Sequence, residues 1–135
     1  MARILELERS VFAKDAYTRS MFLNLYSRCR RLFLIAKVSR RIAGYSVTCV
    51  EDGKAEVVSV AVDSGQRRKG VATALLAWTI ERLQECGTRT IDLMVRVDNQ
   101  AAIRFYRRFG FRPLGPVPNY YGKSGTGLRM RRNLR

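Results

Sequence analysis

The sequence predicts an α/β fold in which a mixed, mostly antiparallel sheet is flanked by about four helices. Strand-like runs of β-branched and aromatic residues occupy 32–38, 43–50 and 57–62, and only short turns separate them. An amphipathic helical pattern follows at 71–86, and another apolar run at 90–95 comes after it. Tight turns join antiparallel strands and a helical crossover joins parallel ones, so the sheet should contain both kinds of pairing.

A chain of 135 residues is long enough for one domain with one core, which we assign to residues 1–135. No segment approaches the roughly 18 apolar residues needed to cross a bilayer, and residues 1–10 lack the apolar core of a signal peptide. We therefore expect a soluble, cytoplasmic protein without membrane contact, present as a monomer or weak dimer.

Three cysteines and no histidine restrict the available chemistry. Cys29, Cys49 and Cys86 show no metal-ligand spacing and no even framework, which fits a reducing compartment. Cys49 and Cys86 stand in apolar surroundings and should be buried fillers rather than nucleophiles. We expect no metal site and no histidine base, so proton transfer falls to carboxylates, tyrosines or water.

The formal net charge of +15 should attract polyanions. Charges of about 2–8 are usual for a small soluble domain. Ribosomal RNA or an acidic protein is therefore a candidate partner. A solvated basic face without a specific partner is the alternative.

Each remaining element follows from a local pattern. Residues 4–12 show helical spacing, residues 13–17 interrupt it, and Thr18 is placed to cap a second helix to about residue 26. That helix should bury Met21, Phe22, Leu25 and Tyr26. The turns at 39–41 and 51–54 separate the first strands, and the second carries an Asp-Gly signal. Gly44 marks either close backbone packing or a weak strand position.

The C-terminal third should add a strand, a helix and two more strands. Asn99 is placed to cap a helix that ends at Gly110 and buries Ala102, Ile103, Tyr106 and Phe109. Residues 112–117 and 128–134 are the last two strands, with a loop over 118–127. Alternation along 128–135 would gather its arginines into one basic stripe.

A basic glycine loop lies between the strand at 57–62 and the helix at 71–86. The first turn of that helix offers unpaired N–H groups and the positive end of the helix dipole, while Arg67, Arg68 and Lys69 add full charges. These features predict a pyrophosphate site. A side chain at Gly70 would hold the phosphates off the backbone.

Three motifs in this order resemble those of the GNAT acetyltransferases. Arg67-x-x-Gly70-x-Ala72 resembles the acetyl-CoA signature Arg/Gln-x-x-Gly-x-Gly/Ala, and residues 97–111 are similar to the block N-x-x-A-x-x-x-Y-x-x-x-G-F. Asn119-Tyr120-Tyr121 stands at the matching place in protein N-terminal acetyltransferases, including the ribosomal-protein alanine N-acetyltransferases. The resemblance implies splayed central strands, acetyl-CoA as cosubstrate and direct acetyl transfer to an amine.

Most GNAT proteins have a strand before the first helix, and the present sequence has almost no room for one. Either the sequence starts late or the sheet lacks that edge strand.

The resemblance also implies a set of cofactor contacts. The pantetheine arm would pair with the backbone of Val60, Ala61 and Val62, and the pyrophosphate would lie on the loop and helix start, comprising Arg67, Arg68, Lys69, Gly70, Val71, Ala72 and Thr73. Asn99 matches a family asparagine that contacts the cofactor, and a plain helix cap is its alternative. Tyr106 matches the family tyrosine that contacts the cofactor and serves as general acid, and a core tyrosine is its alternative.

The general base is less clearly marked. Ribosomal-protein alanine N-acetyltransferases carry a glutamate in Leu-Glu-Val-Arg, where this chain has Met94, which cannot accept a proton. Glu56 is the remaining candidate if it faces the cleft. An outward ion pair of Glu56 and a water relay through Tyr120 or Tyr121 are the alternatives.

The acceptor implied by the resemblance is a protein N-terminus, and a ribosomal protein is the expected type. Asn119, Tyr120 and Tyr121 would contact it, as would Tyr17 and its neighbours at 14–16 between the first two helices. Lysine side chains or small amines are alternative acceptors, although 11 acidic residues disfavour polycations. A catalytically weak, basic RNA- or ribosome-binding descendant is a further alternative.

Overall fold

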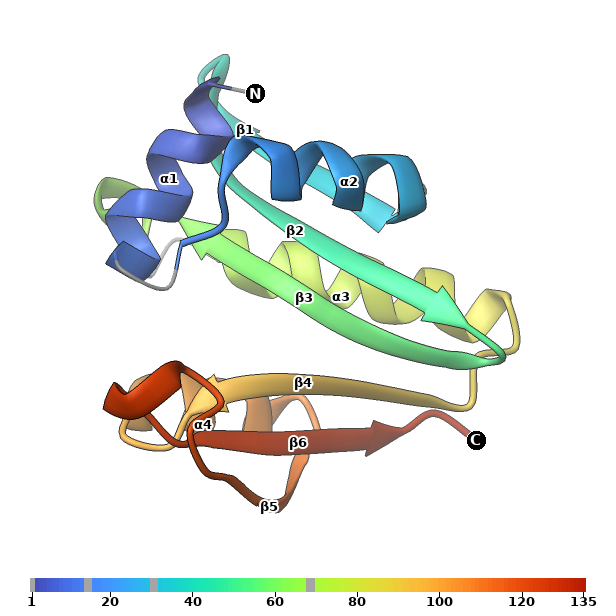
Figure 1. The fold of residues 1–135 in the computed structure, drawn as a ribbon. Helices are drawn as coiled ribbons and strands as arrows, with labels where there is room; N and C mark the ends of the chain where they lie inside the picture. The colour runs from blue at the N-terminus through green and yellow to red at the C-terminus, as the bar shows by residue number, and fades with distance from the viewer. Residues whose placement is uncertain (1, 14–15, 30–31, 68–69) are drawn as a thin grey trace.

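The computed structural model describes residues 2–13, 16–29, 32–67 and 70–135. Figure 1 shows one sheet with strand order β1-β2-β3-β4-β6-β5 and helices on both of its faces. The elements in chain order are α1 (Ala2–Phe12), α2 (Arg19–Cys29), β1 (Phe33–Val38), β2 (Arg41–Glu51), β3 (Lys54–Val62), η3 (Ser64–Gln66), α3 (Val71–Glu85), β4 (Thr90–Arg96), α4 (Gln100–Arg108), β5 (Arg112–Val117), η4 (Gly122–Ser124) and β6 (Gly127–Asn133). This architecture confirms the predicted fold class.

Strands β1, β2 and β3 form the predicted antiparallel meander. Both connections turn through residues with positive φ, Ser39 and Arg40 at 50° and 70°, then Asp52 and Gly53 at 53° and 75°. Two successive positive φ values are typical of the turns that match the twist of a hairpin. Strand β4 is parallel to β3, while β6 runs antiparallel to both β4 and β5.

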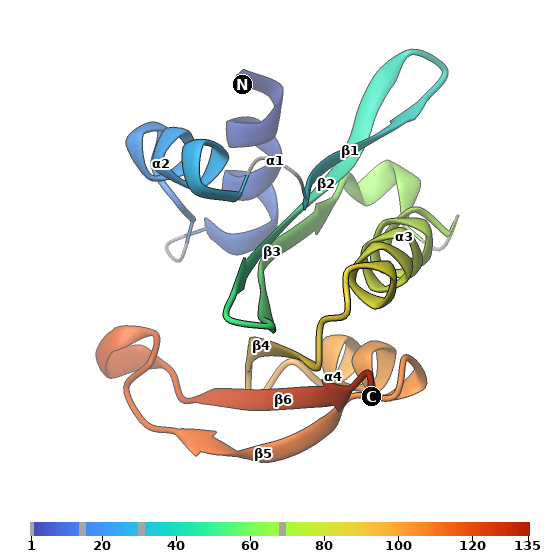
Figure 2. The same cartoon turned by 90° about the vertical axis from the view of Figure 1, so that its right-hand side faces the viewer.

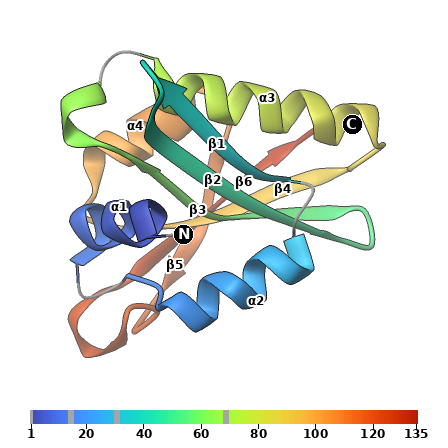
Figure 3. The same ribbon diagram turned by 90° about the horizontal axis from the view of Figure 1, so that it is seen from above.

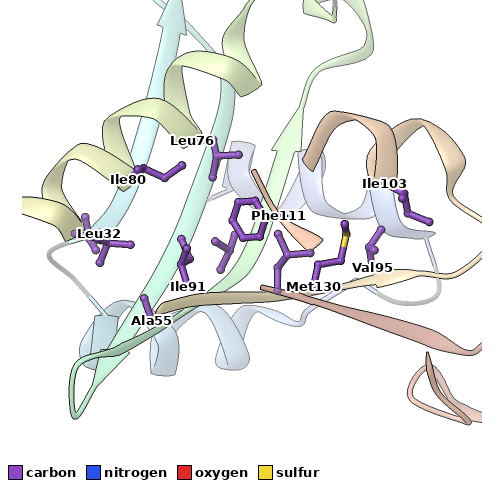
Figure 4. Packing of buried hydrophobic residues seen from close by; sticks show 12 residues of the cluster. Leu32, Ala55, Leu76, Ile80, Ile91, Val95, Ile103, Phe111 and Met130 are labelled. Atoms are coloured by element: carbon purple, nitrogen blue, oxygen red, sulfur yellow. The ribbon is translucent and has the colours of Figure 1, made fainter. Parts of the chain in front are cut away.

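The helices cover the two faces of the sheet unequally. Helices α1 and α2 lie over β2 and β3 on one face, and α3 and α4 lie on the other (Figures 2 and 3). Residues from α3, α4, β3, β4 and β6 form the largest apolar cluster, which includes Leu76, Ile91, Ile103, Phe111 and Met130 (Figure 4). Among the described elements, no α-helix covers the face of β4, β6 and β5 opposite α4 (Figure 2).

Helix α2 is less deeply buried than its sequence pattern predicted. Phe22 is fully buried, but the side chains of Met21 and Tyr26 are 45% and 48% exposed. The prediction that both are buried was wrong, because α2 packs along β2 near the edge of the sheet and only a narrow stripe is covered. Thr18 caps this helix as predicted, since its Oγ1 accepts from the Met21 amide at 3.3 Å. The Leu25 side chain lies outside the described ones.

Gly44 on β2 allows the start of α3 to approach the sheet. A Cβ at this position would lie 2.8 Å from the Ala61 carbonyl oxygen and 3.0 Å from Val71 Cγ1. Both atoms belong to well-packed parts of the chain, so a larger residue would push α3 away from β2 and β3. Of the two interpretations of Gly44, the structure supports close packing.

The cysteines differ from their predicted states. Cys29 at the end of α2 and Cys49 on β2 form a disulfide, and Cys86 is free and exposed. The predictions of unpaired cysteines and a buried Cys86 were therefore wrong. The sequence spacing did not indicate this pair, because the two cysteines meet only when α2 folds back over β2. The argument from the cysteines for a reducing compartment therefore no longer holds.

None of the helices in the described part of the chain is long and apolar enough to cross a membrane.

Candidate functional site

Strands β3 and β4 separate part-way along their length. They pair only where Lys54–Val57 lies beside Thr90–Leu93. A register shift against β2 then leaves Val58 as the extra residue of a β-bulge, which bends β3 away. Within the described residues, no strand pairs with the β4-facing edge of β3 beyond Val57. The strands are splayed (Figure 1), as the sequence resemblance implied.

A cleft of about 630 Å³ opens where the two strands part. Its walls come from α1, the segment between α1 and α2, β3, β4, α4 and the segment before η4. Although they are far apart in the sequence, seven of the candidate residues line this cleft. They are Tyr17, Glu56, Val60, Asn99, Tyr106, Tyr120 and Tyr121.

Glu56 faces the cleft rather than an ion-pair partner. It lies on β3 opposite Asp92 of β4, on the same side of the sheet as Met94. It forms no salt bridge with any of the described residues, whereas Asp92 is engaged by Arg131 at 2.6 Å and Arg129 at 3.6 Å. The alternative of an outward ion pair for Glu56 is thus not what the structure shows.

Two phenols lie within the electrostatic reach of Glu56. Burial, followed by the charges of Tyr120, Glu8 and Glu56, raises the pKa of Tyr17 to about 12. Burial and then the Glu56 charge also raise the pKa of Tyr120, against the opposing effect of Arg129. Both phenols are consequently neutral hydrogen-bonding groups near pH 7, and Glu56 is the one carboxylate among the described lining residues.

Tyr106 reaches the cleft from α4. Its ring packs against Phe105 and Phe111, with centroids 5.3 and 5.7 Å away, and burial raises its pKa to about 12. Across the described chain, its hydroxyl has no hydrogen-bond partner in the protein. The ring thus packs against the core, and the residue also lines the cleft.

Asn99 caps α4, since its Oδ1 accepts from the Ala102 amide at 3.2 Å, and it also lines the cleft.

The three candidate residues of the loop at 119–121 differ in position. Asn119 has φ of 60° in a turn and is not among the lining residues, whereas Tyr120 and Tyr121 are. The two tyrosine rings meet edge to face at 4.9 Å, and the Arg96 guanidinium lies 4.6 Å from the Tyr121 ring. This contact gives Tyr121 a fixed place in the wall.

The predicted phosphate loop lies beside the start of α3. Gly70 is its N-cap with φ of 80°, and a Cβ there would meet no atom within 4 Å. The space above the first turn is therefore open, and the positive φ favours glycine. Arg67 is exposed, and Val71 is buried against β2 and β3. Arg68 and Lys69 lie outside the described residues.

The arginines of β6 do not form a single stripe. Arg129 and Arg131 lie on the face without a helix and pair with Asp92, but Arg132 lies on the other face and donates to the Phe109 carbonyl oxygen at 2.8 Å. The prediction of one stripe was wrong because alternation sends neighbouring arginines to opposite faces of the sheet.

Sequence reasoning missed Glu8, which is 1% exposed and holds three hydrogen bonds beneath the cleft. A glutamate on the apolar face of the first helix, between Leu7 and Val11, was the available signal. Charged residues on an apolar face are fully buried only when they have polar partners.

Comparison with known proteins agrees with this geometry. The Acetyltransferase (GNAT) family model matches residues 1–111. The chain belongs to the GNAT acetyltransferase family. An uncharacterized N-acetyltransferase of Methanocaldococcus jannaschii is 36% identical over 127 residues, which cover 93% of this chain and 80% of that protein.

Two further similarities place the chain within the GNAT family. A putative [ribosomal protein bS18]-alanine N-acetyltransferase of Bacillus subtilis is 27% identical over 126 residues, covering 90% of this chain and 81% of that one. The crystal structure of Ard1 from Thermoplasma volcanium superposes with a TM-score of 0.92 at 28% identity, covering 98% and 89% of the two chains. The chain is thus a GNAT N-acetyltransferase with a splayed sheet.

Proposed function

We propose that this acetyltransferase moves the acetyl group of acetyl-CoA to the α-amine of a protein N-terminus. The observation that carries the proposal is the cleft between β3 and β4, where Glu56 and Tyr106 line the same space as Tyr17, Tyr120 and Tyr121. The name of the Bacillus subtilis relative supports an α-amine of a ribosomal protein as the type of acceptor.

The chain has the features that acetyl-CoA would need. The unpaired edge of β3 at Val60, Ala61 and Val62 offers backbone groups to an amide-containing arm. The open N-terminus of α3 at Gly70, extending to Ala72 and Thr73, would hold the pyrophosphate together with Arg67. Asn99 lines the cleft nearby. When bound, acetyl-CoA supplies an acetyl group activated as a thioester.

Glu56 and Tyr106 would then divide the proton transfers. An amine attacks only after losing its proton, and Glu56 is the carboxylate available in the cleft to accept it, directly or through one water. Tyr106 would donate to the departing sulfur. Its pKa of about 12 keeps the phenol protonated, and its hydroxyl is not committed to a protein acceptor in the described residues.

The acceptor would enter between Tyr17 on one side and Tyr120 and Tyr121 on the other. Neutral phenols can hydrogen-bond the peptide backbone, and their rings wall a small pocket. Val11, Phe12 and Met94 add apolar surface to the same cleft. An α-ammonium group would meet Glu56, and the rest of the peptide would lie against the tyrosines.

The test is acetyl transfer from acetyl-CoA to matched peptides, with the modified nitrogen located by mass spectrometry. One peptide has a free α-amine and no lysine, and the other has a blocked α-amine and one internal lysine. We expect modification of the first peptide only. Modification of the lysine peptide alone would replace the N-terminal acceptor by a side-chain amine, and binding of acetyl-CoA without transfer to either would exclude peptide acceptors of both kinds.

A further inference from the structure

A buried carboxylate connects two of the segments that line the cleft. Glu8 lies on the inner face of α1 and is 1% exposed. It does not line the cleft itself, and the proposed proton transfers do not use it. Burial of a carboxylate is costly unless hydrogen bonds replace the lost water, so the partners of Glu8 indicate what it maintains.

All three partners donate to Glu8. Oε1 accepts from the Tyr45 hydroxyl and from the Ser59 hydroxyl, the latter at 3.0 Å. Oε2 accepts from the backbone N–H of Tyr17 at 2.9 Å. Tyr45 and Ser59 are themselves buried on β2 and β3. Burial, followed by the hydrogen bond to Glu8, raises the pKa of Tyr45, which keeps this phenol available as a donor.

Two of these partners line the cleft and come from different elements. Ser59 directly follows the bulge residue Val58, where β3 turns away from β4. Tyr17 lies in the segment between α1 and α2, and it lines the cleft near Tyr120 and Glu56. Glu8 therefore connects the backbone at Tyr17 to the bulged strand β3.

We propose that Glu8 is a positioning residue for the acceptor peptide, acting through Tyr17. By holding the Tyr17 amide, the carboxylate fixes where the phenol stands relative to β3 and hence how wide the peptide entrance is. The inference rests on the proposed N-terminal acetyl transfer. It assigns Glu8 no contact with either substrate.

The variant Glu8→Leu removes both carboxylate oxygens and with them the acceptor of the Tyr17 N–H. Glu8→Gln is the conservative variant, because its amide oxygen can accept from the Tyr17 N–H while its NH2 donates to the hydroxyls of Tyr45 and Ser59, so it should keep the wild-type KM for the peptide. In Glu8→Leu we expect the KM for a free-N-terminus peptide to rise about tenfold, while kcat at saturating peptide and the Kd of acetyl-CoA stay within twofold. Tyr45→Phe is the matched control, since it removes one donor to Oε1 and leaves the Tyr17 contact. It should lower the melting temperature without raising the peptide KM.

A double variant tests whether Glu8 acts through Tyr17. In Glu8→Leu combined with Tyr17→Ala, the peptide KM should be no higher than in Tyr17→Ala alone, because the group being positioned is gone. Additive increases would overturn the proposal, as would an unchanged KM in Glu8→Leu or an equal rise in Tyr45→Phe. Absence of transfer by the wild type in the same assay would instead overturn the proposed function.

Amide hydrogen exchange on the wild-type protein gives a readout independent of activity and of variant folding. The Tyr17 amide should exchange at least a hundredfold more slowly than the amide of exposed Asn119, because a buried carboxylate accepts from it. Equal exchange rates at the two positions would show that Glu8 does not hold this segment, and the proposal would fail.

Discussion

The sulfur of Met94 occupies the space that a side chain on Gly127 would need. A Cβ on Gly127 would lie 2.9 Å from Met94 Sδ and 3.0 Å from Tyr120 Cβ. Met94 and Gly127 lie on the paired strands β4 and β6. Met94 and Tyr120 both line the cleft. Met94 therefore packs as part of an apolar wall of the cleft.

Gly127→Ala should disturb this wall without unfolding the protein. The added methyl group must displace Met94, whose flexible side chain can move, and Tyr120, whose Cβ cannot move without the backbone. We expect a loss of about 1–3 kcal/mol in the free energy of unfolding, as is usual for overpacking. The peptide KM should rise, whereas the Kd of acetyl-CoA should not change. Urea unfolding and steady-state kinetics measure the two effects, and unaltered stability would contradict the tight packing.

Glu56→Gln tests the proposed base. Removal of a general base lowers the rate by about 10²–10⁴-fold, so kcat/KM for a free-N-terminus peptide should fall in this range. Asp92→Asn is the matched control because it removes a carboxylate from the next strand, where Arg131 engages it outside the cleft. That variant should retain full turnover. If Glu56→Gln were as active as the wild type, Glu56 would not be the base, and a water relay through Tyr120 or Tyr121 would take its place.

Stability should decline in alkali because buried phenols resist ionisation. The pKa values of Tyr106 and Tyr45 are raised above the ordinary value near 10, to about 12 for Tyr106. In the unfolded chain they lose their protons first as pH rises, so the folded state is fully stabilised below pH 10 and loses stability from about pH 10 to 12. Each contributes a slope of at most about 1.4 kcal/mol per pH unit.

Denaturant melts at pH 9, 10 and 11 would measure this slope. Tyr45→Phe should be less stable than the wild type at pH 9 but should show a flatter decline above pH 10. A decline just as steep in Tyr45→Phe would exclude this phenol as a source of the pH dependence.

The disulfide should be a measurable part of the stability. Cys29 and Cys49 are 20 residues apart, and cross-links closing loops of this size stabilise by about 2–4 kcal/mol. Cys29→Ser should lower the unfolding free energy by that amount under non-reducing conditions, and a reductant should have the same effect on the wild type. Cys86→Ser is the control, because the exposed free thiol contributes little. If reductant left the unfolding midpoint of the wild type unchanged, the Cys29–Cys49 pairing would be contradicted.

Local sequence signals were sufficient for most of the fold. The Asp52-Gly53 turn, the Asn99 cap and the left-handed Gly110 each follow from one residue's backbone preferences, and the structure shows all three. The motifs also selected several of the polar residues that line the cleft, among them Asn99, Tyr106 and Tyr120. Glu56 and Tyr106 are 50 residues apart, yet the parallel crossover brings both into the same space.

What the sequence left open depended on contacts between distant segments. Exposure of Met21 reflects how little of α2 the sheet edge covers, and the Cys29–Cys49 pair requires α2 to fold back over β2. Burial of Glu8 requires donors from β2, from β3 and from the segment after α1 at once. No local sequence pattern predicts these contacts, because they depend on how whole helices and strands pack together.

The most direct test of the account compares Tyr106→Phe with the wild type for acetyl-CoA binding and for acetyl transfer. The substitution keeps the ring that packs against Phe105 and Phe111 and removes only the hydroxyl in the cleft. We expect the Kd of acetyl-CoA to stay within twofold and kcat for a free-N-terminus peptide to fall about 10²-fold or more. Full turnover by Tyr106→Phe would contradict the assignment of Tyr106 as the proton donor in this cleft.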